Sequence, residues 1–227
     1  MKVVILAGGL GSRMSEYTKT IPKPMVKIKK KPILVHIMEH YNSFGFNDFL
    51  IASGYKNKVI KEYFKKKKNP NWTVNIVNTG LKTMTGGRLK RLEKYLKNET
   101  FLMTYGDGIS NVDLNKLITF HKKNKKIMTL TAVRPPARFG TLKISGNLVK
   151  YFKEKSQIDE GWINGGFFVV EPNIFKFLKD DNTILEKQPI EKLTLKKQLI
   201  AYKHKKFWQC LDTKRDIDLL NKRKGKI

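Results

Sequence analysis

Residues 1–25 read MKVVILAGGLGSRMSEYTKTIPKPM, and this stretch predicts how the rest of the chain is arranged. Residues 3–6 are apolar and mostly β-branched, which is typical of a buried strand. Glycines follow at once, and glycine lets the backbone pass close to a ligand. A strand that opens into such a turn leaves successive N–H groups pointing outward, an arrangement that holds anions. We therefore expect a phosphate-binding loop directly after the first strand.

Two cations accompany these glycines. Arg13 carries a planar fork of donors that fits phosphate oxygens, and Lys23 adds a point charge between two prolines. A P-loop is excluded because no Gly-Lys-Ser or Gly-Lys-Thr follows. The spacing of Gly8, Gly9 and Gly11 does not fit the dinucleotide pattern G-x-G-x-x-G either. The plainer alternative is a solvated turn, but the Pro-Lys-Pro at this offset favours the phosphate loop.

The length and composition fit one globular domain. A chain of 227 residues can bury a single core, so we expect residues 1–227 to form one domain. No run of eighteen apolar residues occurs, and we expect no membrane insertion. The single cysteine, Cys210, cannot form an internal disulfide, and the N-terminus lacks the apolar region of a signal peptide. A cytoplasmic location is the simplest interpretation.

The charge balance raises an alternative function. Lys and Arg number 47 against 19 Asp and Glu, which gives a net charge of +28. A nucleic-acid-binding module would explain such a charge. However, the excess is scattered lysine without the interleaved aromatic residues that a stacking platform needs. We therefore expect no specific nucleic-acid partner, and we expect the charge to attract anionic substrates.

Helix and strand patterns alternate along the first part of the chain. Helices are predicted over residues 32–44, 59–64, 87–96 and 113–121, and strands over 48–52, 73–77, 100–105 and 128–133. This order predicts an α/β fold, with a mostly parallel, mixed sheet and helices on both faces. The second part is less regular, and a hairpin around residues 145–147 indicates a small inserted sheet. The remaining predicted elements are strands at 162–170 and 199–202 and helices at 172–178, 186–197 and from Thr213.

The segment Thr83-Met84-Thr85-Gly86-Gly87-Arg88 opens one of these predicted helices. A helix N-terminus offers free N–H groups and partial positive charge, and small residues there would let the backbone approach a base. A cation in the first turn is disfavoured by the helix dipole, so Arg88 invites an anionic partner such as a phosphate. The alternative is a loop-to-helix junction with an exposed arginine.

Asp107 and Asp212 are the candidate metal ligands. Asp107 stands between glycines at the end of the predicted strand 100–105, and ligands of open α/β sheets bind beyond the carboxyl ends of strands. A carboxylate that faces a triphosphate needs a cation between the two charges, and Mg²⁺ takes carboxylates, waters and phosphates. Asp212 is the partner we choose for Asp107, although it is also a good cap for the helix that follows.

A second phosphate site is predicted from Lys155, which ends a strand-like segment. Asn164 and Gly165 lie inside an apolar strand, and an interior glycine weakens a strand unless something approaches it closely. Their amide and backbone groups would suit sugar hydroxyls.

Together these motifs resemble the sugar-1-phosphate nucleotidyltransferase family. The resemblance rests on residues 6–13, 22–25, 83–91, 105–108, 138–140, 163–168 and 207–213, which occur in the family's order. It implies a Rossmann-like nucleotidyltransferase fold and an enzyme that joins a nucleoside triphosphate to a sugar phosphate, releasing pyrophosphate. The agreement is strongest with members that transfer CMP from CTP to α-D-glucose 1-phosphate with Mg²⁺, giving CDP-glucose for dideoxysugar and surface-polysaccharide synthesis. The alternative is a sister enzyme for another nucleotide, another phosphorylated sugar or a phosphonate.

The resemblance also implies a role for each motif. Residues 1–133 would form a nucleotide-binding half, and residues 134–227 a sugar-phosphate-binding and closing half. A homo-oligomer is compatible with it, although the region 65–73, which the family associates with contacts across subunits, is much shorter here. The catalytic residues would be Arg13, Lys23 and Asp107, the metal ligands Asp107 and Asp212, and the sugar-phosphate-binding residues Lys155, Asn164 and Gly165. The nucleotide would contact Leu6, Ala7, Gly8, Gly9, Leu10, Gly11, Ser12, Arg13, Lys23, Thr83, Gly86, Gly87, Arg88 and Gly106.

Overall fold

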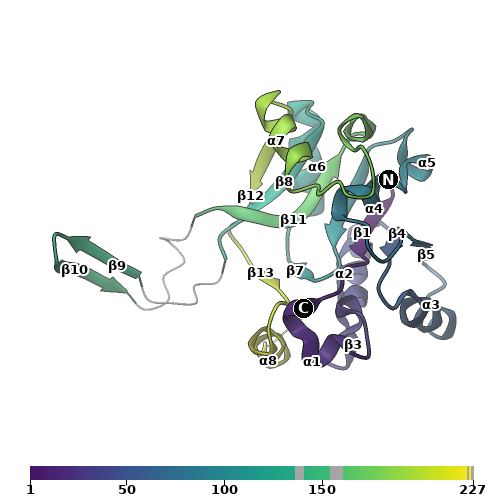
Figure 1. Cartoon of the computed structure of the whole chain (residues 1–227), viewed down its shortest axis with the longest axis horizontal. Coiled ribbons are helices and arrows are strands. Elements are labelled where there is room, and N and C mark those ends of the chain that lie inside the picture. Colours follow the sequence, from purple (N-terminus) through teal and green to yellow (C-terminus); the bar gives the residue numbers. More distant parts are fainter. Residues whose placement is uncertain (136–140, 154–160, 224, 226–227) are drawn as a thin grey trace.

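A seven-stranded mixed sheet forms the centre of the molecule (Figure 1). The structure is a computed structural model that describes residues 1–135, 141–153, 161–223 and 225. In spatial order the strands are β12 (Leu199–Lys203), β8 (Met128–Val133), β11 (Ile163–Val170), β6 (Phe101–Tyr105), β1 (Val3–Ala7), β4 (Asp48–Ser53) and β5 (Thr73–Asn78). β11 runs antiparallel to both of its neighbours, and all other pairs are parallel. The predicted mostly parallel, mixed sheet is therefore confirmed.

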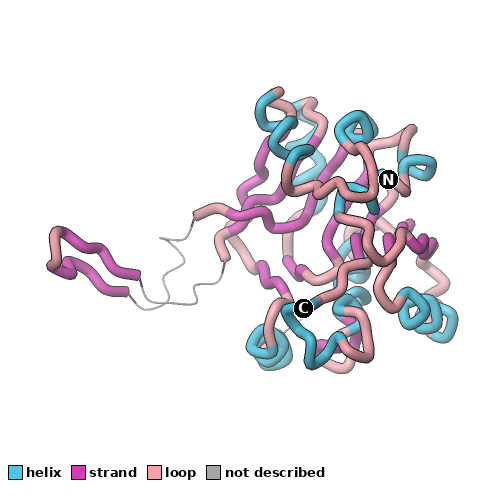
Figure 2. The backbone as a smooth tube through the Cα atoms, viewed as in Figure 1, coloured by secondary structure: helices cyan, strands magenta, loops and turns pink. Residues whose placement is uncertain are grey.

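Helices cover both faces of this sheet, as predicted (Figure 2). Each face has its own apolar cluster, because the fully buried β1 alternates its side chains between the two sides. One face is covered by α2 (Ile33–Asn42), α3 (Asn57–Lys66), α6 (Leu114–Asn124) and α8 (Lys214–Lys222). The other is covered by α4 (Thr85–Lys90), α5 (Glu93–Leu96), the 3-10 helix η3 (Pro172–Phe177) and α7 (Gln188–Leu195). No helix in the described part of the chain is both long and apolar enough to cross a membrane.

Three small two-stranded sheets complete the fold. The predicted hairpin is present as β9 (Thr141–Ser145) and β10 (Leu148–Lys153), and Gly146 has the positive φ of 57° that its turn requires. It is drawn apart from the central sheet in Figures 1 and 2. The other pairs are β2 (Lys27–Ile28) with β3 (Lys31–Pro32), and β7 (Gly108–Ser110) with β13 (Trp208–Cys210). The β7–β13 pair was not predicted from the sequence, because three-residue strands carry too little periodicity.

Two predicted helices differ from those observed. The predicted helix 87–96 is divided into α4 and α5, because Leu92 donates to the carbonyl of Leu89 and Tyr95 to that of Leu92 in i→i−3 bonds. The predicted helix 172–178 is the 3-10 helix η3, which begins at Pro172 and is likewise closed by i→i−3 bonds. The remaining predicted helices and strands are confirmed, with ends that differ by a few residues.

The register of β1 and β6 aligns two glycine turns at one edge of the sheet. Leu6 pairs with Tyr105, and the N–H of Gly106 donates to the carbonyl of Leu6 at 3.0 Å. The turn that begins at Gly8 and the turn at Gly106-Asp107 therefore start side by side. This edge is where ligands of open α/β sheets bind.

The burial of His40 predicts that the stability of the protein depends on pH. Its ring packs edge-on against Phe44 and Phe167, and burial, with a smaller contribution from His204, lowers its pKa from 6.5 to about 4. Between these pH values the imidazole binds a proton in the unfolded chain but not in the native state. The free energy of unfolding therefore decreases as the pH falls from about 6.5 towards 4. The expected contribution is about 3 kcal/mol.

Urea unfolding of wild type and His40→Phe at pH 7 and pH 4.5 measures this contribution. We expect the wild type to lose more stability than the variant between these values. An equal loss in the two proteins would contradict the assignment to His40.

Candidate functional site

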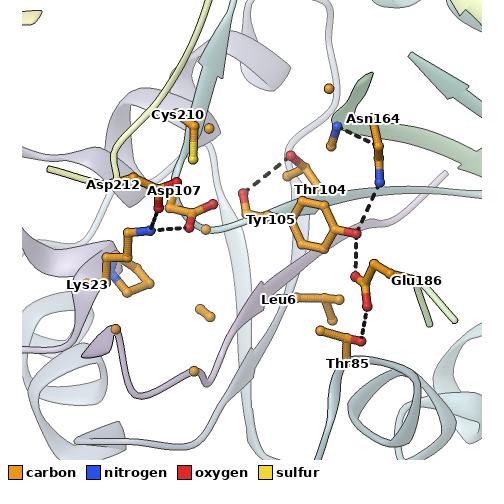
Figure 3. A pocket seen from close by; sticks show the side chains of 18 of the residues that line it. Leu6, Lys23, Thr85, Thr104, Tyr105, Asp107, Asn164, Glu186, Cys210 and Asp212 are labelled. Atoms are coloured by element: carbon orange, nitrogen blue, oxygen red, sulfur yellow. Dashed lines mark hydrogen bonds and ion pairs between the residues drawn. The ribbon is translucent and has the colours of Figure 1, made fainter. Parts of the chain in front are cut away.

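A pocket of about 520 Å³ opens at the carboxyl ends of β1 and β6 (Figure 3). This volume is typical of pockets that bind small molecules. The pocket brings together predicted residues from distant parts of the chain, which are Leu6, Ala7, Gly9, Gly11, Ser12, Lys23, Gly106, Asp107, Asn164, Gly165 and Asp212.

The glycine loop after β1 forms one wall of this pocket. Gly11 has a positive φ of 67°, and a Cβ there would lie 2.8 Å from the Thr18 side chain. The hydroxyl of Thr18 donates to the carbonyl of Gly11 at 3.1 Å and so fixes the turn. The chain continues through two short helical turns, η1 (Ser12–Met14) and α1 (Ser15–Thr18), and returns to the pocket at η2 (Lys23–Met25). The glycine loop is therefore fixed between β1, which precedes it, and Thr18 of α1, which bonds to it.

Lys23 joins the two predicted metal ligands. It follows Pro22 at the start of η2, is buried, and places its Nζ 2.6 Å from Asp107 and 2.7 Å from Asp212 (Figure 3). Burial alone would lower the pKa of Lys23, but the charge of Asp107 and the hydrogen bonds to both carboxylates outweigh it and raise the pKa. The lysine is therefore a fixed cation between two carboxylates.

Backbone hydrogen bonds fix the chain around each carboxylate, beside the β7–β13 pair for Asp107 and at the start of α8 for Asp212. The N–H of Leu211 donates to the carbonyl of Asp107 at 2.8 Å. Asp216, which is buried at the start of α8, accepts from the N–H groups of Asp212 and Thr213 at 2.9 and 2.7 Å. Asp216 and Thr213 form a capping box, so the predicted helix start at Thr213 is confirmed. Asp212 itself is left to face the pocket.

The donor set at this point fits a divalent cation. One ligand atom from each of Asp107, Asp212 and Cys210 lies within 4.8 Å of the others. Two carboxylates this close repel each other unless a cation lies between them, and Lys23 supplies a single positive charge. The carboxylate oxygens are ligands that hard divalent ions prefer.

The opposite side of the pocket is a chain of polar side chains that the sequence did not reveal, apart from Asn164 (Figure 3). Asn164 donates to the hydroxyl of Tyr105, which donates to Glu186. The other oxygen of Glu186 accepts from Thr85 at 2.6 Å. Glu186 precedes α7 in a segment where no glycine or motif marked it. Tyr105 could have been found, since it adjoins the Gly-Asp-Gly turn.

Arg88 supports the glycine loop from behind, which corrects the expectation that it contacts a phosphate. Its side chain is buried, and its terminal nitrogens donate to the carbonyl of Gly8 at 2.9 Å and to Thr79 Oγ1 and the Gly80 carbonyl at 2.7 Å. A Cβ on Gly8 would lie 2.1 Å from the Arg88 guanidinium. Its donors are therefore used by the carboxyl ends of β1 and β5, and Arg88 does not line the pocket.

Gly86 and Gly87 also differ from their predicted role. A Cβ on Gly87 would lie 2.6 Å from backbone atoms of Asp181, and one on Gly86 would lie 2.8 Å from the carbonyl oxygen of Thr183. The close approach that these glycines permit is thus to the segment before α7 and not to a base. Thr83 is buried beside Gly80 and does not line the pocket either.

Two further predicted residues, Gly8 and Leu10, do not line the pocket. Gly8 is behind it with Arg88, and Leu10 is exposed. Lys155 and the motif 138–140 lie outside the described residues, as does the side chain of Arg13.

Comparisons with known proteins agree on one family. A sequence model of the nucleotidyl transferase family matches residues 2–214. The glucose-1-phosphate cytidylyltransferase of Salmonella typhi is 46% identical over 95% of this chain and 93% of its own length. The D-glycero-α-D-manno-heptose 1-phosphate guanylyltransferase of Campylobacter jejuni is 35% identical, covering 77% of this chain and 78% of its own. The crystal structure of HddC from Yersinia pseudotuberculosis complexed with GMP-PN superposes with a TM-score of 0.76 at 27% identity, covering 97% of each chain.

Substituting Gly87 tests its packing role. We expect Gly87→Ala to lower the free energy of unfolding by about 1–3 kcal/mol, because the methyl group would collide with the Asp181 backbone. Gly9→Ala is the matched control, since no atom lies within 4 Å of a Cβ there. Urea unfolding of both variants measures the difference, and equal stabilities would contradict the packing.

Arg88→Lys tests the support of the glycine loop. A lysine ammonium cannot reach the acceptors on both strand ends. The carbonyl of Gly8 keeps the N–H of Tyr55, but a buried acceptor that loses its partner, such as the Gly80 carbonyl, costs about 1–3 kcal/mol. We expect a clear fall in the midpoint of urea unfolding. Arg91→Lys, which alters an exposed ion pair with Asp181, should cost less than about 1 kcal/mol. A stable Arg88→Lys protein would refute this role.

Proposed function

Because the chain belongs to the nucleotidyl transferase family, we propose that it transfers CMP from CTP to α-D-glucose 1-phosphate, giving CDP-glucose and pyrophosphate. On this proposal it is a cytoplasmic enzyme that supplies CDP-glucose for surface-polysaccharide synthesis. The observation that carries the proposal is the convergence of the glycine loop, Lys23 and the Asp107–Asp212 pair in one pocket. The identity to the Salmonella typhi cytidylyltransferase extends over nearly the whole length of both chains, which supports the choice of substrates.

The chemistry requires no general base from the protein. The attacking group is an oxygen of the sugar phosphate, whose second pKa is about 6, so it is already ionised near neutral pH. Its bond to the α-phosphorus of CTP forms as the bond to the β-phosphate oxygen breaks, and pyrophosphate carries away the electron pair. Catalysis then depends on holding the two substrates in line and on neutralising their charges.

The described residues supply these two contributions. Gly9 and Gly11 of the glycine loop line the pocket where the triphosphate would bind, and backbone N–H groups of such a loop suit phosphate oxygens. Lys23 is the cation at the same end. Asp107 and Asp212 would hold Mg²⁺, which when bound supplies further positive charge to the phosphates.

The two halves of the chain contribute different parts of the pocket. In the proposed division, residues 1–133 bind the nucleotide, and residues 134–227 bind the sugar phosphate and close the site. Asn164 and Gly165 of β11 line the pocket, which supports the sugar end. We retain Lys155 and Arg13 as proposed contacts of the sugar phosphate and the triphosphate, respectively.

Substituting Asp107 tests the metal assignment. We expect Asp107→Asn to lower kcat by at least about a hundredfold, since one cation ligand and one partner of Lys23 lose their charge. Asp218→Asn is the control, because Asp218 is an exposed acid on α8. The assay measures Mg²⁺-dependent pyrophosphate release together with the unfolding midpoint. Near-normal activity of a folded Asp107→Asn would exclude the assigned role.

Nucleotide choice tests the cytidylyl assignment. The amino group of cytosine donates where uracil has an acceptor, and a mismatch at one buried edge costs about 1–3 kcal/mol, or roughly five- to a hundredfold. We expect kcat/KM with glucose 1-phosphate to be higher for CTP than for UTP and dTTP by that factor. Equal values for CTP and UTP would leave only the broader nucleotidyltransferase.

A further inference from the structure

Glu186 presents an unpaired negative charge to the pocket. Its carboxylate accepts hydrogen bonds from the hydroxyls of Tyr105 and Thr85, one on each oxygen. Among the described residues, no lysine, arginine or histidine forms an ion pair with it. A carboxylate has about four acceptor positions, and Glu186 is exposed, so positions remain for a ligand.

The two ends of the pocket differ in whether their carboxylates are paired with a cation. Figure 3 shows Lys23 with its two aspartates on one side and Glu186 with Tyr105 and Asn164 on the other. Phosphates suit the first end, because the glycine loop adjoins it, Lys23 offsets part of the charge of its two aspartates, and these aspartates would hold Mg²⁺. They are repelled from the second, where a carboxylate has no cation beside it. The second end therefore suits an uncharged part of a substrate.

The groups at this second end match sugar hydroxyls. A hydroxyl both donates and accepts hydrogen bonds. Glu186 and the hydroxyl of Tyr105, whose proton goes to Glu186, offer acceptors, whereas the amide of Asn164 can both donate and accept. Asn164 is itself oriented, because its Oδ1 accepts from the N–H of Gly166 at 2.9 Å. Glu186 is held between β6 and the N-terminus of α4 by Tyr105 and Thr85, so its carboxylate has a defined direction.

We propose that Glu186 determines the sugar specificity of the pocket by accepting a hydrogen bond from a hexose hydroxyl of the sugar phosphate. This inference rests on the proposed function and names the residue that reads the uncharged part of its second substrate. Glu186 also links the segment before α7, which packs on Gly86 and Gly87, to the wall of the pocket.

The test combines Glu186→Gln with sugars that lack one hydroxyl. The variant keeps the shape of the side chain but loses its charge and half of its acceptors. We expect kcat/KM for glucose 1-phosphate at saturating CTP to fall about tenfold to a hundredfold, the usual range for a charge-assisted hydrogen bond, and KM for CTP to change less than about twofold. Glu191→Gln, an exposed acid on α7, is the matched control and should behave as wild type.

A set of 2-, 3-, 4- and 6-deoxyglucose 1-phosphates then shows whether the contact is direct. If Glu186 accepts from one hydroxyl, the sugar that lacks this hydroxyl should reduce the cost of Glu186→Gln to less than about threefold. An equal cost with glucose 1-phosphate and all four analogues would overturn the direct contact. A changed ratio of CTP to UTP with unchanged sugar kinetics would overturn it in favour of a base contact.

Two further measurements keep the inference separate from the proposed function. The affinity ratio of CDP-glucose to CDP, measured by calorimetry, should fall in Glu186→Gln and not in Glu191→Gln. Glu186→Asp, which keeps the charge but withdraws the carboxylate, replaces Glu186→Gln if that variant unfolds, and should show the same loss. Wild-type protein without turnover on CTP and glucose 1-phosphate would overturn the proposed function and this inference together. Normal wild-type turnover, with Glu186→Gln matching Glu191→Gln, would overturn the inference alone.

Discussion

The ammonium of Lys23 between Asp107 and Asp212 is the interaction on which the site depends. It joins positions that are 84 and 189 residues apart in the chain. Two carboxylates at the edge of one sheet would repel each other without it, and burial without them would lower the pKa of the lysine. The three residues therefore determine one another's position, and Lys23 lies beside Gly11 of the glycine loop.

This cluster also explains the asymmetry of the pocket. Charge neutralisation is concentrated at the end where β1 and β6 finish, and it suits phosphates and a divalent cation. The polar chain from Asn164 through Tyr105 to Glu186 lies at the other side, where the carboxylate of Glu186 has no cation beside it. A substrate with a phosphate at one end and hydroxyls at the other fits such an arrangement, which is the chemistry of a sugar phosphate.

Much of the fold, and the pocket end that holds Lys23 and the glycine loop, could be predicted from the sequence, because the local sequence patterns there indicate the same arrangement. Apolar strands end in glycine or in Gly-Asp-Gly, and parallel strands bring those ends together. The rest depends on contacts between distant segments. Arg88 was expected to seek a phosphate, but the acceptors of its guanidinium are carbonyls and a hydroxyl from other strand ends. Gly86 and Gly87 predict that another group approaches the backbone closely, but the sequence does not identify this group, which is the segment at 181–185. No motif around Glu186 marks it as a site residue, because its position depends on hydrogen bonds from Tyr105 and Thr85, which are distant in the sequence.

The central claim is that one pocket joins a nucleotide to a sugar phosphate. ³¹P NMR of the wild-type protein with CTP, glucose 1-phosphate and Mg²⁺ tests it most directly, because each phosphorus atom reports its own bonding. The account predicts that the sugar-phosphate signal converts into the coupled pair of a diphosphate while pyrophosphate appears in equal amount. Conversion of CTP to CMP or CDP while the glucose 1-phosphate signal stays unchanged would contradict it, since the protein would then hydrolyse the nucleotide without transferring it.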